Sequence, residues 1–206
     1  MRKFILSLAV LALAVSPALA GKYNKKVSIG EKAPDFAGIP AYDPATKETT
    51  SLTLKDLKDD VVVLVFLANH CPVVVNYEDR IIDFVNDYKD KNVKVVGVSV
   101  SDSKVDNLEA IKKRFQGTKK DSNYLYGSDE TQAIGRAYGA TNTPQFFVLD
   151  KDRVIRYMGA MDDSQNEANV KTRYLRSAVD ALLAGKSIPE GQQETRPVGC
   201  GIGYKN

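Results

Sequence analysis

The stretch VVVLVFLANHCP occupies residues 61–72 and decides the fold. Its first seven residues are apolar and mostly β-branched, as expected of a central strand that is buried on both faces. A short polar turn follows at residues 68–70, and Pro72 suits the first turn of a helix, where its missing N–H costs nothing. Apolar residues then recur at helical spacing to about residue 88. The stretch therefore predicts a buried strand, a tight turn, and a helix that begins directly after Cys71.

Further strands and helices alternate along the rest of the chain. The pattern predicts a second buried strand at 93–100, helices at 107–115, 130–138 and 170–183, and short strands at 145–149 and 154–158. Alternation of this kind favours an α/β fold with parallel central strands, and the polar turn at 150–152 adds an antiparallel hairpin at one edge. We expect a three-layer α/β/α sandwich with a central mixed sheet. Residues 21–50 should form an N-terminal extension with short strands.

The first 20 residues have the layout of a secretory signal peptide. Arg2 and Lys3 precede an apolar run at residues 4–15, and Ala18-Leu19-Ala20 puts small residues at the positions that determine cleavage. The run is too short to span a bilayer as an anchor, although an uncleaved N-terminal anchor is the alternative interpretation. We expect an exported protein, periplasmic or extracellular, with no stable membrane insertion after cleavage.

We expect the mature chain to have one domain at 21–187 and a tail at 188–206. Lys and Arg number 29, or 27 without Arg2 and Lys3, against 26 acidic residues. This nearly neutral balance lacks the electrostatic footprint of a nucleic-acid-binding protein. The tail is rich in Pro and Gly, which favours a mobile or draped segment over regular structure.

Cys71 is the candidate nucleophile of the chain. At a helix N-terminus it would face unpaired backbone N–H groups and the positive end of the helix dipole, which both favour the thiolate. His70, the only histidine, is its neighbour and adds positive charge when protonated. A buried, inert cysteine is the alternative, but a position at a junction rather than inside an apolar run favours reactivity.

Thr143 and Pro144 form a second candidate element, directly before the strand expected at 145–149. A proline at this place often follows a cis peptide bond, which exposes backbone that an extended substrate can pair with. An ordinary trans proline at the start of a strand is the alternative.

Together these pieces resemble the redoxin branch of the thioredoxin superfamily, which includes the alkyl hydroperoxide reductase/thiol-specific antioxidant domains. The chain is similar to a peroxiredoxin-like family with a CNHCP-type site over roughly residues 27–205. The matching pieces are Ala-Asn-His-Cys-Pro at 68–72, Tyr-Glu-Asp-Arg at 77–80, Thr143-Pro144, residues 159–163 and residues 197–200. The resemblance implies a thioredoxin-like fold and thiol redox chemistry at Cys71, Cys200 and His70. It also implies a substrate site at Asn69, Pro72, Thr143 and Pro144.

The chain departs from both parent mechanisms of this superfamily. Ala68 stands where thioredoxin-like members carry the first cysteine of CxxC, so the usual dithiol cycle within that motif is impossible. Peroxiredoxins attack from the position that matches Cys71, but they place a threonine where this chain has Ala68. The strand start where their arginine would be expected reads Thr143-Pro144.

Cys200 is the remaining candidate partner, because Gly199 and Gly201 leave its sulfur accessible. Several peroxiredoxins resolve their oxidised cysteine with one in a C-terminal tail. Three roles stay open for Cys200: a resolving thiol for Cys71, one half of a permanent disulfide, and an unpaired thiol.

Other polar residues carry weaker functional hypotheses. Glu78 falls about two helical turns after Cys71, where it would assist proton transfer or simply be a solvated carboxylate. Asp162 and Asp163 resemble a paired-carboxylate site, but a turn before the last helix explains them as well. We assign no cofactor and no metal, because His70, Cys71, Met161 and Cys200 are scattered and lack the spacing of a metal site.

Three functions are consistent with these residues. The first is a thiol-dependent oxidoreductase that acts on disulfides through Cys71, with Cys200 or an external thiol reductant as the resolving partner. The second is a peroxiredoxin-like peroxidase with a peroxide substrate. The third is a non-catalytic binding module that uses the groove at Pro144.

Overall fold

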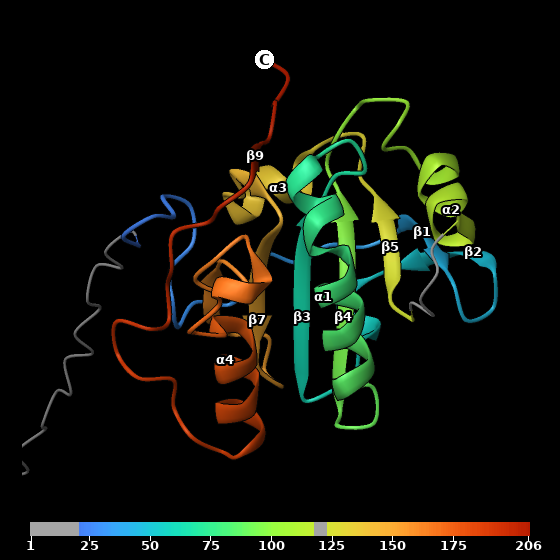
Figure 1. Cartoon of the computed structure of the whole chain (residues 1–206). Coiled ribbons are helices and arrows are strands. Elements are labelled where there is room, and N and C mark those ends of the chain that lie inside the picture. The colour runs from blue at the N-terminus through green and yellow to red at the C-terminus, as the bar shows by residue number, and fades with distance from the viewer. Residues whose placement is uncertain (1–20, 118–122) are drawn as a thin grey trace, which may run out of the picture.

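The computed structural model describes residues 21–117 and 123–206, and within them one mixed sheet organises the molecule (Figure 1). Its strands lie in the order β2-β1-β5-β4-β3-β7-β8. Strands β3, β4 and β5 are parallel, and β1, β7 and β8 each pair antiparallel with their neighbours. The bounds are β1 Ile39–Asp43, β2 Glu48–Leu52, β3 Val61–Leu67, β4 Val93–Ser99, β5 Leu125–Ser128, β7 Gln145–Leu149 and β8 Ile155–Gly159.

Strand β3 lies inside the sheet, and its side chains fill two separate cores. Val61, Val63 and Val65 pack under helices α1 (Pro72–Tyr88), α2 (Leu108–Gly117) and α4 (Tyr174–Leu183). Its alternate residues pack on the other face, under α3 (Ala133–Tyr138) and the N-terminal segment. Figure 1 shows α1 and α4 in front of the sheet. The apolar run thus correctly predicted a central strand, because such a strand is covered on both faces.

The predicted elements all exist, with shifts at some of their ends. The last helix begins at Tyr174 rather than at residue 170, after a short 3₁₀ turn at Glu167–Asn169. The helix expected at 130–138 begins at Ala133. In the N-terminal extension, β1 and β2 form an antiparallel hairpin, and β1 also pairs with β5 and widens the sheet.

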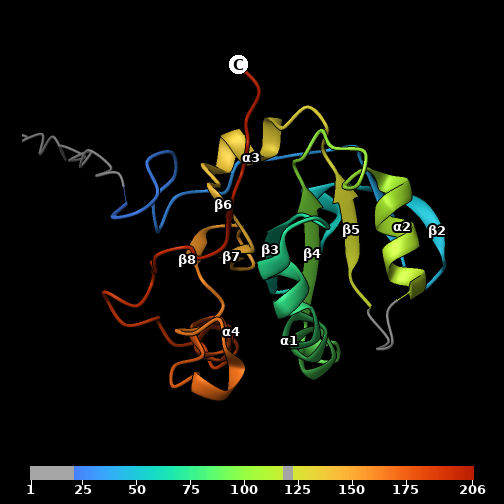
Figure 2. The ribbon, with the colours of Figure 1, turned by 45° about the horizontal axis from the view of Figure 1, so that its top comes forward.

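The C-terminal tail lies against the domain, and one part of it is regular. Strand β9 (Cys200–Gly201) pairs antiparallel with β6 (Asn142–Thr143), so the expectation that the tail holds no regular structure was wrong at this point. Figure 2 shows the tail, in red, running past β8 and β6 to α3. The signal peptide prediction falls on residues 1–20, outside the described residues. In the described part of the chain, no helix has the length and apolar character needed to cross a membrane.

Candidate functional site

The junction between β3 and α1 places Cys71 where the sequence predicted. Cys71 is the N-cap of α1, Pro72 follows in the first turn, and the Cys71 carbonyl accepts the Val75 N–H at 3.1 Å. The Cys71 side chain makes no capping hydrogen bond and is fully buried. The helix dipole therefore acts on this sulfur without a direct hydrogen bond from the helix amides.

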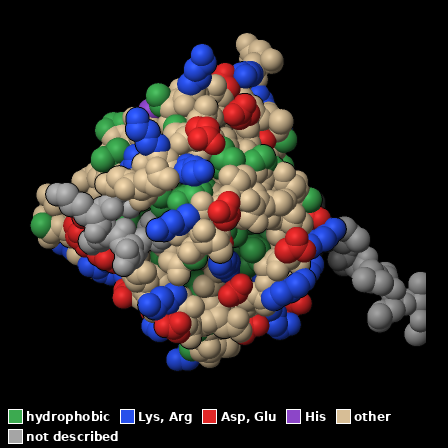
Figure 3. All heavy atoms as spheres, turned by 90° about the vertical axis from the view of Figure 1, so that its right-hand side faces the viewer, with side chains coloured by type: hydrophobic (Ala, Val, Ile, Leu, Met, Phe, Trp, Pro, Cys, Tyr) green, Lys and Arg blue, Asp and Glu red, His purple; other side chains and the backbone are tan. Residues whose placement is uncertain are grey.

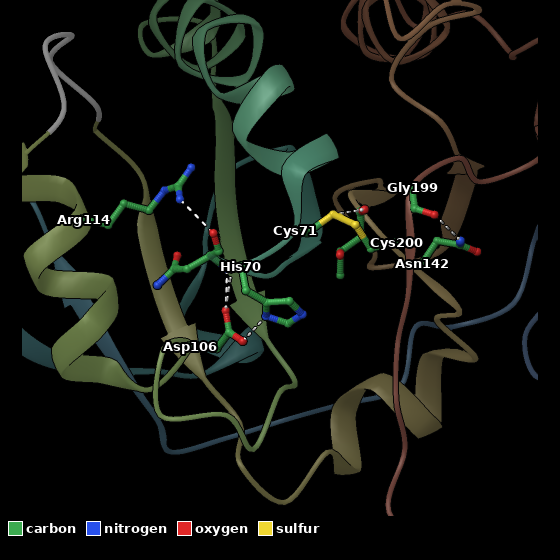
Figure 4. Close-up of a disulfide and its surroundings, with 9 residues drawn as sticks. His70, Cys71, Asp106, Arg114, Asn142, Gly199 and Cys200 are labelled. Atoms are coloured by element: carbon green, nitrogen blue, oxygen red, sulfur yellow. Dashed lines mark hydrogen bonds and ion pairs between the residues drawn. A yellow bond between two sulfur atoms is a disulfide. The ribbon is translucent and has the colours of Figure 1, made fainter.

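A disulfide joins Cys71 to Cys200, 129 residues further along the chain (Figure 4). The two Cα atoms are 5.9 Å apart, within the usual span for this bond. Strand pairing aligns the tail for it, because Thr143 lies opposite Cys200 and Asn142 lies opposite Gly201. Cys71 Sγ is also 3.2 Å from the carbonyl oxygen of Thr143. Both cysteines and Thr143 are thus brought together, and the unpaired-thiol alternative does not describe this state.

The backbone next to Pro144 already has a partner. The Thr143–Pro144 peptide bond is cis, which decides between the two alternatives that the sequence left open. Thr143 and Pro144 are both buried. Because β9 occupies the edge of β6, the tail of the chain lies where an extended substrate was expected to pair.

Gly199 allows this close approach of the tail. A Cβ atom built on Gly199 would lie 2.0 Å from the Thr143 carbonyl oxygen, which no side chain can tolerate. The Gly199 carbonyl in turn accepts a hydrogen bond from Asn142 Nδ2 at 3.0 Å. The glycine before Cys200 is therefore a packing requirement of the disulfide, rather than only a flexible neighbour.

The tail beyond Cys200 is held by α3 and the loops beside it. Gln132, which is almost completely buried, donates to the carbonyls of Val100 and Gly203 at 2.8 Å and accepts the Lys205 N–H at 2.8 Å. Tyr204 donates its hydroxyl to the Ala140 carbonyl at 2.8 Å. These contacts dock the residues after Cys200 on the domain.

The tail is also anchored before Cys200, at Glu194. Its carboxylate accepts three consecutive backbone N–H groups, of Lys22, Tyr23 and Asn24, at 2.6, 2.6 and 2.7 Å. The neighbouring Thr195 N–H donates to the Met158 carbonyl of β8 at 3.0 Å. The N-terminal segment and the tail therefore hold each other against the sheet.

Asp106 is a site residue that sequence reasoning missed. It lies in the loop after β4, and its fully buried carboxylate accepts the N–H of Asn69 at 2.5 Å, the N–H of His70 at 3.3 Å and a bond with His70 Nδ1. Its position in the sequence could have indicated this role. Asp106 follows β4 and Cys71 follows β3, and the carboxyl ends of these two parallel strands meet at one edge of the sheet. Asp106 therefore fixes the turn that leads into Cys71.

Arg114 of α2 reaches the same turn from the other side. It donates to Glu78 at 2.8 Å and to the Asn69 carbonyl at 3.2 Å, as Figure 4 shows for the second contact. Glu78 is thus held in an ion pair with α2, which disfavours the hypothesis that it moves protons at Cys71.

The predicted carboxylate pair separates into two structural roles. Asp162 is buried against Arg80 of α1, with Oδ2 2.6 Å from Nη1, and it also accepts from the Tyr77 hydroxyl at 3.1 Å. Burial raises the pKa of Asp162 above its usual value and that of Tyr77 to about 12. Asp163 instead accepts the backbone N–H of Lys171 at 2.9 Å. The two carboxylates therefore do not form a paired site.

A small cavity lies beside the disulfide. It has a volume of about 50 Å³ and is bounded by Ala68, His70, Thr143 and Gly201, among others. His70 is half-exposed here, whereas Cys71 is closed off from solvent. The arrangement brings an imidazole and a disulfide to one edge of the sheet, where thiol–disulfide exchange is the chemistry that these groups support.

A peroxiredoxin is among the known proteins with similar sequences. The chain is 28% identical over 191 residues to the chloroplastic 2-Cys peroxiredoxin BAS1 of Arabidopsis thaliana, with 86% of this chain covered. It spans 66% of that relative's length, just under two thirds.

Solved structures share the fold. A hypothetical protein from Sinorhizobium meliloti 1021 is similar with a TM-score of 0.72 and 30% identity, over 88% of this chain and 97% of that one. A putative thiol:disulfide interchange protein DsbE from Chlorobium tepidum has a TM-score of 0.59 and 22% identity, over 76% and 99% of the two chains, and supports the fold alone. The three-layer fold is thus thioredoxin-like, as expected.

The family model named Redoxin matches residues 28–174, which include β3, Cys71, Asp106 and the Thr143–Pro144 bond. Because this model covers more than half of the chain, the chain belongs to the Redoxin family.

Proposed function

We propose that this protein is a thiol-dependent oxidoreductase that cycles between the Cys71–Cys200 disulfide and two thiols. The observation that carries the proposal is the bond itself, which links a helix N-cap cysteine to a cysteine on a separately docked tail. A helix N-terminus stabilises a thiolate, so Cys71 is a good leaving group when the disulfide is attacked. The substrate is a disulfide or mixed disulfide, and an external thiol returns the protein to its reduced form.

The burial of the two cysteines gives the exchange a direction. Cys71 is fully buried, whereas Cys200 is half-buried on the tail. An incoming thiolate therefore attacks Cys200 Sγ, the S–S bond to Cys71 breaks, and Cys71 departs with the electron pair. A second thiol of the reductant then displaces Cys200 and becomes oxidised, which leaves both cysteines of this chain reduced.

The reduction potential of the folded protein tests this proposal. Equilibration with glutathione or dithiothreitol buffers, followed by thiol alkylation and intact mass, gives the fraction oxidised at each potential. Thiol–disulfide oxidoreductases lie at about −270 to −120 mV, and permanent structural disulfides lie below about −300 mV. We expect a value in the first range.

Matched single-cysteine variants test which of the two sulfurs exchanges with a reagent in solution. Cys71→Ser leaves Cys200 on the tail, and Cys200→Ser leaves Cys71 in the core. We expect Cys200 in the first variant to form a mixed disulfide with a model disulfide faster than Cys71 in the second. In the wild type, a Cys71–Cys200 disulfide that is reduced only after the protein unfolds would contradict the oxidoreductase function.

A peroxiredoxin-like peroxidase is the second candidate, and the similarity to a 2-Cys peroxiredoxin supports it. In that cycle Cys71 thiolate takes one oxygen from a peroxide and becomes a sulfenic acid, and Cys200 then condenses with it and releases water. The site favours this cycle less, because Ala68 supplies no hydroxyl and the Arg114 guanidinium is held by Glu78 and the Asn69 carbonyl.

Intact mass after stoichiometric peroxide separates the two candidates. A sulfenic acid in Cys200→Ser that becomes a disulfide in the wild type would favour the peroxidase. Fast reaction with a disulfide but not with peroxide would favour the oxidoreductase, and reaction with neither would favour a binding module.

We also propose that the protein is exported and works in an oxidising compartment. The support is the sequence of residues 1–20 together with the disulfide, a bond that is rare in proteins of the cytosol. Sequencing the N-terminus of the protein isolated from its native cells tests this. We expect cleavage after Ala20, and an intact N-terminus on a cytosolic, reduced protein would contradict it.

A further inference from the structure

Asp106 is a buried carboxylate for which the proposed exchange reaction has so far no role. Its side chain is fully buried, and a carboxylate removed from water is costly unless hydrogen bonds and charges compensate. Oδ1 accepts two backbone N–H groups, of Asn69 and His70, and Oδ2 contacts His70 Nδ1. All three partners belong to the two residues directly before Cys71. The carboxylate is therefore built into the turn that carries the reactive cysteine.

This contact decides which nitrogen of His70 carries the proton. An ionised carboxylate only accepts hydrogen bonds, so Nδ1 of His70 must be the donor to Oδ2. In the neutral imidazole the lone pair is then on Nε2. Figure 4 shows the ring with Nδ1 toward Asp106 and its second nitrogen directed away from it.

His70 lies on the wall of a small cavity that residues next to both cysteines also bound. His70 bounds the small cavity together with Thr143 and Gly201. The Thr143 carbonyl contacts Cys71 Sγ, and Gly201 follows Cys200 in β9. The imidazole, which is 53% exposed, and the backbone that flanks both cysteines therefore face the same cavity.

We propose that Asp106 is a positioning residue that holds His70 in the Nδ1–H tautomer, so that Nε2 serves as the proton-transfer atom of thiol–disulfide exchange. This inference rests on the proposed oxidoreductase function. In the reduction step, Nε2 takes the proton of the incoming thiol as its sulfur attacks Cys200 Sγ. The S–S bond breaks, Cys71 leaves with the electron pair, and the imidazolium returns the proton to it. The products are a mixed disulfide on Cys200 and a thiol at Cys71, so atoms and charges balance.

The substitution Asp106→Asn tests this chemistry with little change in size. The Asn oxygen would keep the two backbone N–H groups, so its amide would face His70 and donate to Nδ1. The imidazole would then have to carry its proton on Nε2, and the lone pair needed to accept a proton would be lost. A carboxylate that holds a catalytic histidine in one tautomer has the same role in serine proteases.

Nitrogen-15 NMR of the imidazole reads the tautomer directly. His70 is the only histidine, so one set of ring signals reports it without ambiguity. We expect the Nδ1–H form in the neutral wild type and the Nε2–H form in Asp106→Asn. A wild type in the Nε2–H form would overturn the proposal without the need for any variant.

Reduction kinetics with dithiothreitol test whether the tautomer matters for the reaction. We expect Asp106→Asn to lower the second-order rate constant by about tenfold, somewhat less than the loss typical of acid–base groups themselves. In a His70→Gln background the same substitution should change the rate by less than about twofold, because Asp106 acts through His70. An equal loss in both backgrounds would indicate a merely structural role and overturn the proposal.

The outcomes separate this inference from the proposed function. If dithiothreitol reduces the wild type and Asp106→Asn at the same rate, the role of Asp106 fails and the oxidoreductase function stands. If the folded wild type is not reduced at all, the function fails, and the role in proton transfer fails with it.

Discussion

At the scale of single residues, the disulfide depends on how closely the tail approaches β6. Gly199 has no side chain, and a Cβ there would lie 2.0 Å from the Thr143 carbonyl oxygen. Gly201, two residues later, has open space around its Cα, because a Cβ built there meets nothing within 4 Å. A side chain can therefore be added at Gly201 but not at Gly199.

Gly199→Ala should displace the tail and impair formation of the Cys71–Cys200 bond. The clash is with backbone, which cannot move aside as a flexible side chain can, and overpacking of this kind costs about 1–3 kcal/mol. After air oxidation, alkylation and intact mass should show free thiols in Gly199→Ala, whereas Gly201→Ala should be oxidised like the wild type. Equal oxidation of both variants would show that the tail has room to shift.

A second prediction at this scale concerns the buried pair of Arg80 and Asp162. Both side chains are almost completely buried, and Arg80 also stacks on Tyr77, with 3.7 Å from Cζ to the ring centroid. Arg80→Met should lower the free energy of unfolding by about 3–5 kcal/mol, because it leaves a buried carboxylate without its charge partner. Urea unfolding measures this, and Arg80→Met/Asp162→Asn should be less destabilised than Arg80→Met alone. Additive losses in the double variant would contradict a coupled pair.

At the scale of elements, sequence reasoning predicted the sheet better than the site. Strand β3 was recognisable because an apolar β-branched run has few alternatives, and α1 because Pro72 marks its first turn. The start of α4 was placed four residues early, since nothing in residues 170–173 prevents a helix and the ends of elements are set by tertiary contacts.

The missed parts of the site come from residues far apart in the chain. Asp106 contacts Asn69 and His70 across 36 or 37 residues, and Thr143 pairs with Cys200 across 57. The Pro and Gly content of the tail suggested no regular structure there. Strand β9 has only two residues, which is too few to leave a periodic pattern in the sequence. Such long-range pairings carry no local signal, so an unpaired Cys200 stayed open beside the two roles that pair it with Cys71 until the fold was known.

The contact between the two terminal segments leads to a prediction at the same scale. Glu194 gathers the N–H groups of residues 22–24, and Glu194→Ala removes the acceptor of all three. Hydrogen exchange at these amides should become faster by at least about tenfold, which corresponds to the loss of roughly 1.4 kcal/mol of local protection. Glu190→Ala, an exposed acidic residue of the same tail, is the control and should leave these amides protected. Unchanged exchange in Glu194→Ala would show that other contacts hold this segment.

At the scale of the whole molecule, the disulfide joins two parts of the protein that have their own noncovalent contacts. The bond closes a loop of 129 residues, which in the chain-entropy treatment stabilises the fold by up to about 5 kcal/mol. Figure 3 shows acidic and basic side chains interspersed on the face that carries α2, so this face is not organised around one sign of charge. The disulfide is therefore the covalent link between the site and the docked tail.

This coupling links the tail contacts to the reduction potential. If the tail is docked when Cys71 and Cys200 are bonded and less so when they are reduced, each docking contact stabilises the oxidised form. Gln132 holds the tail at the Gly203 carbonyl and the Lys205 N–H, so Gln132→Ala should make the disulfide easier to reduce. A loss of about 1.4 kcal/mol corresponds to a rise of about 30 mV, which redox titration against glutathione resolves. A potential that does not move would mean that the tail stays docked in both states, with Cys200 held beside Cys71 throughout the cycle.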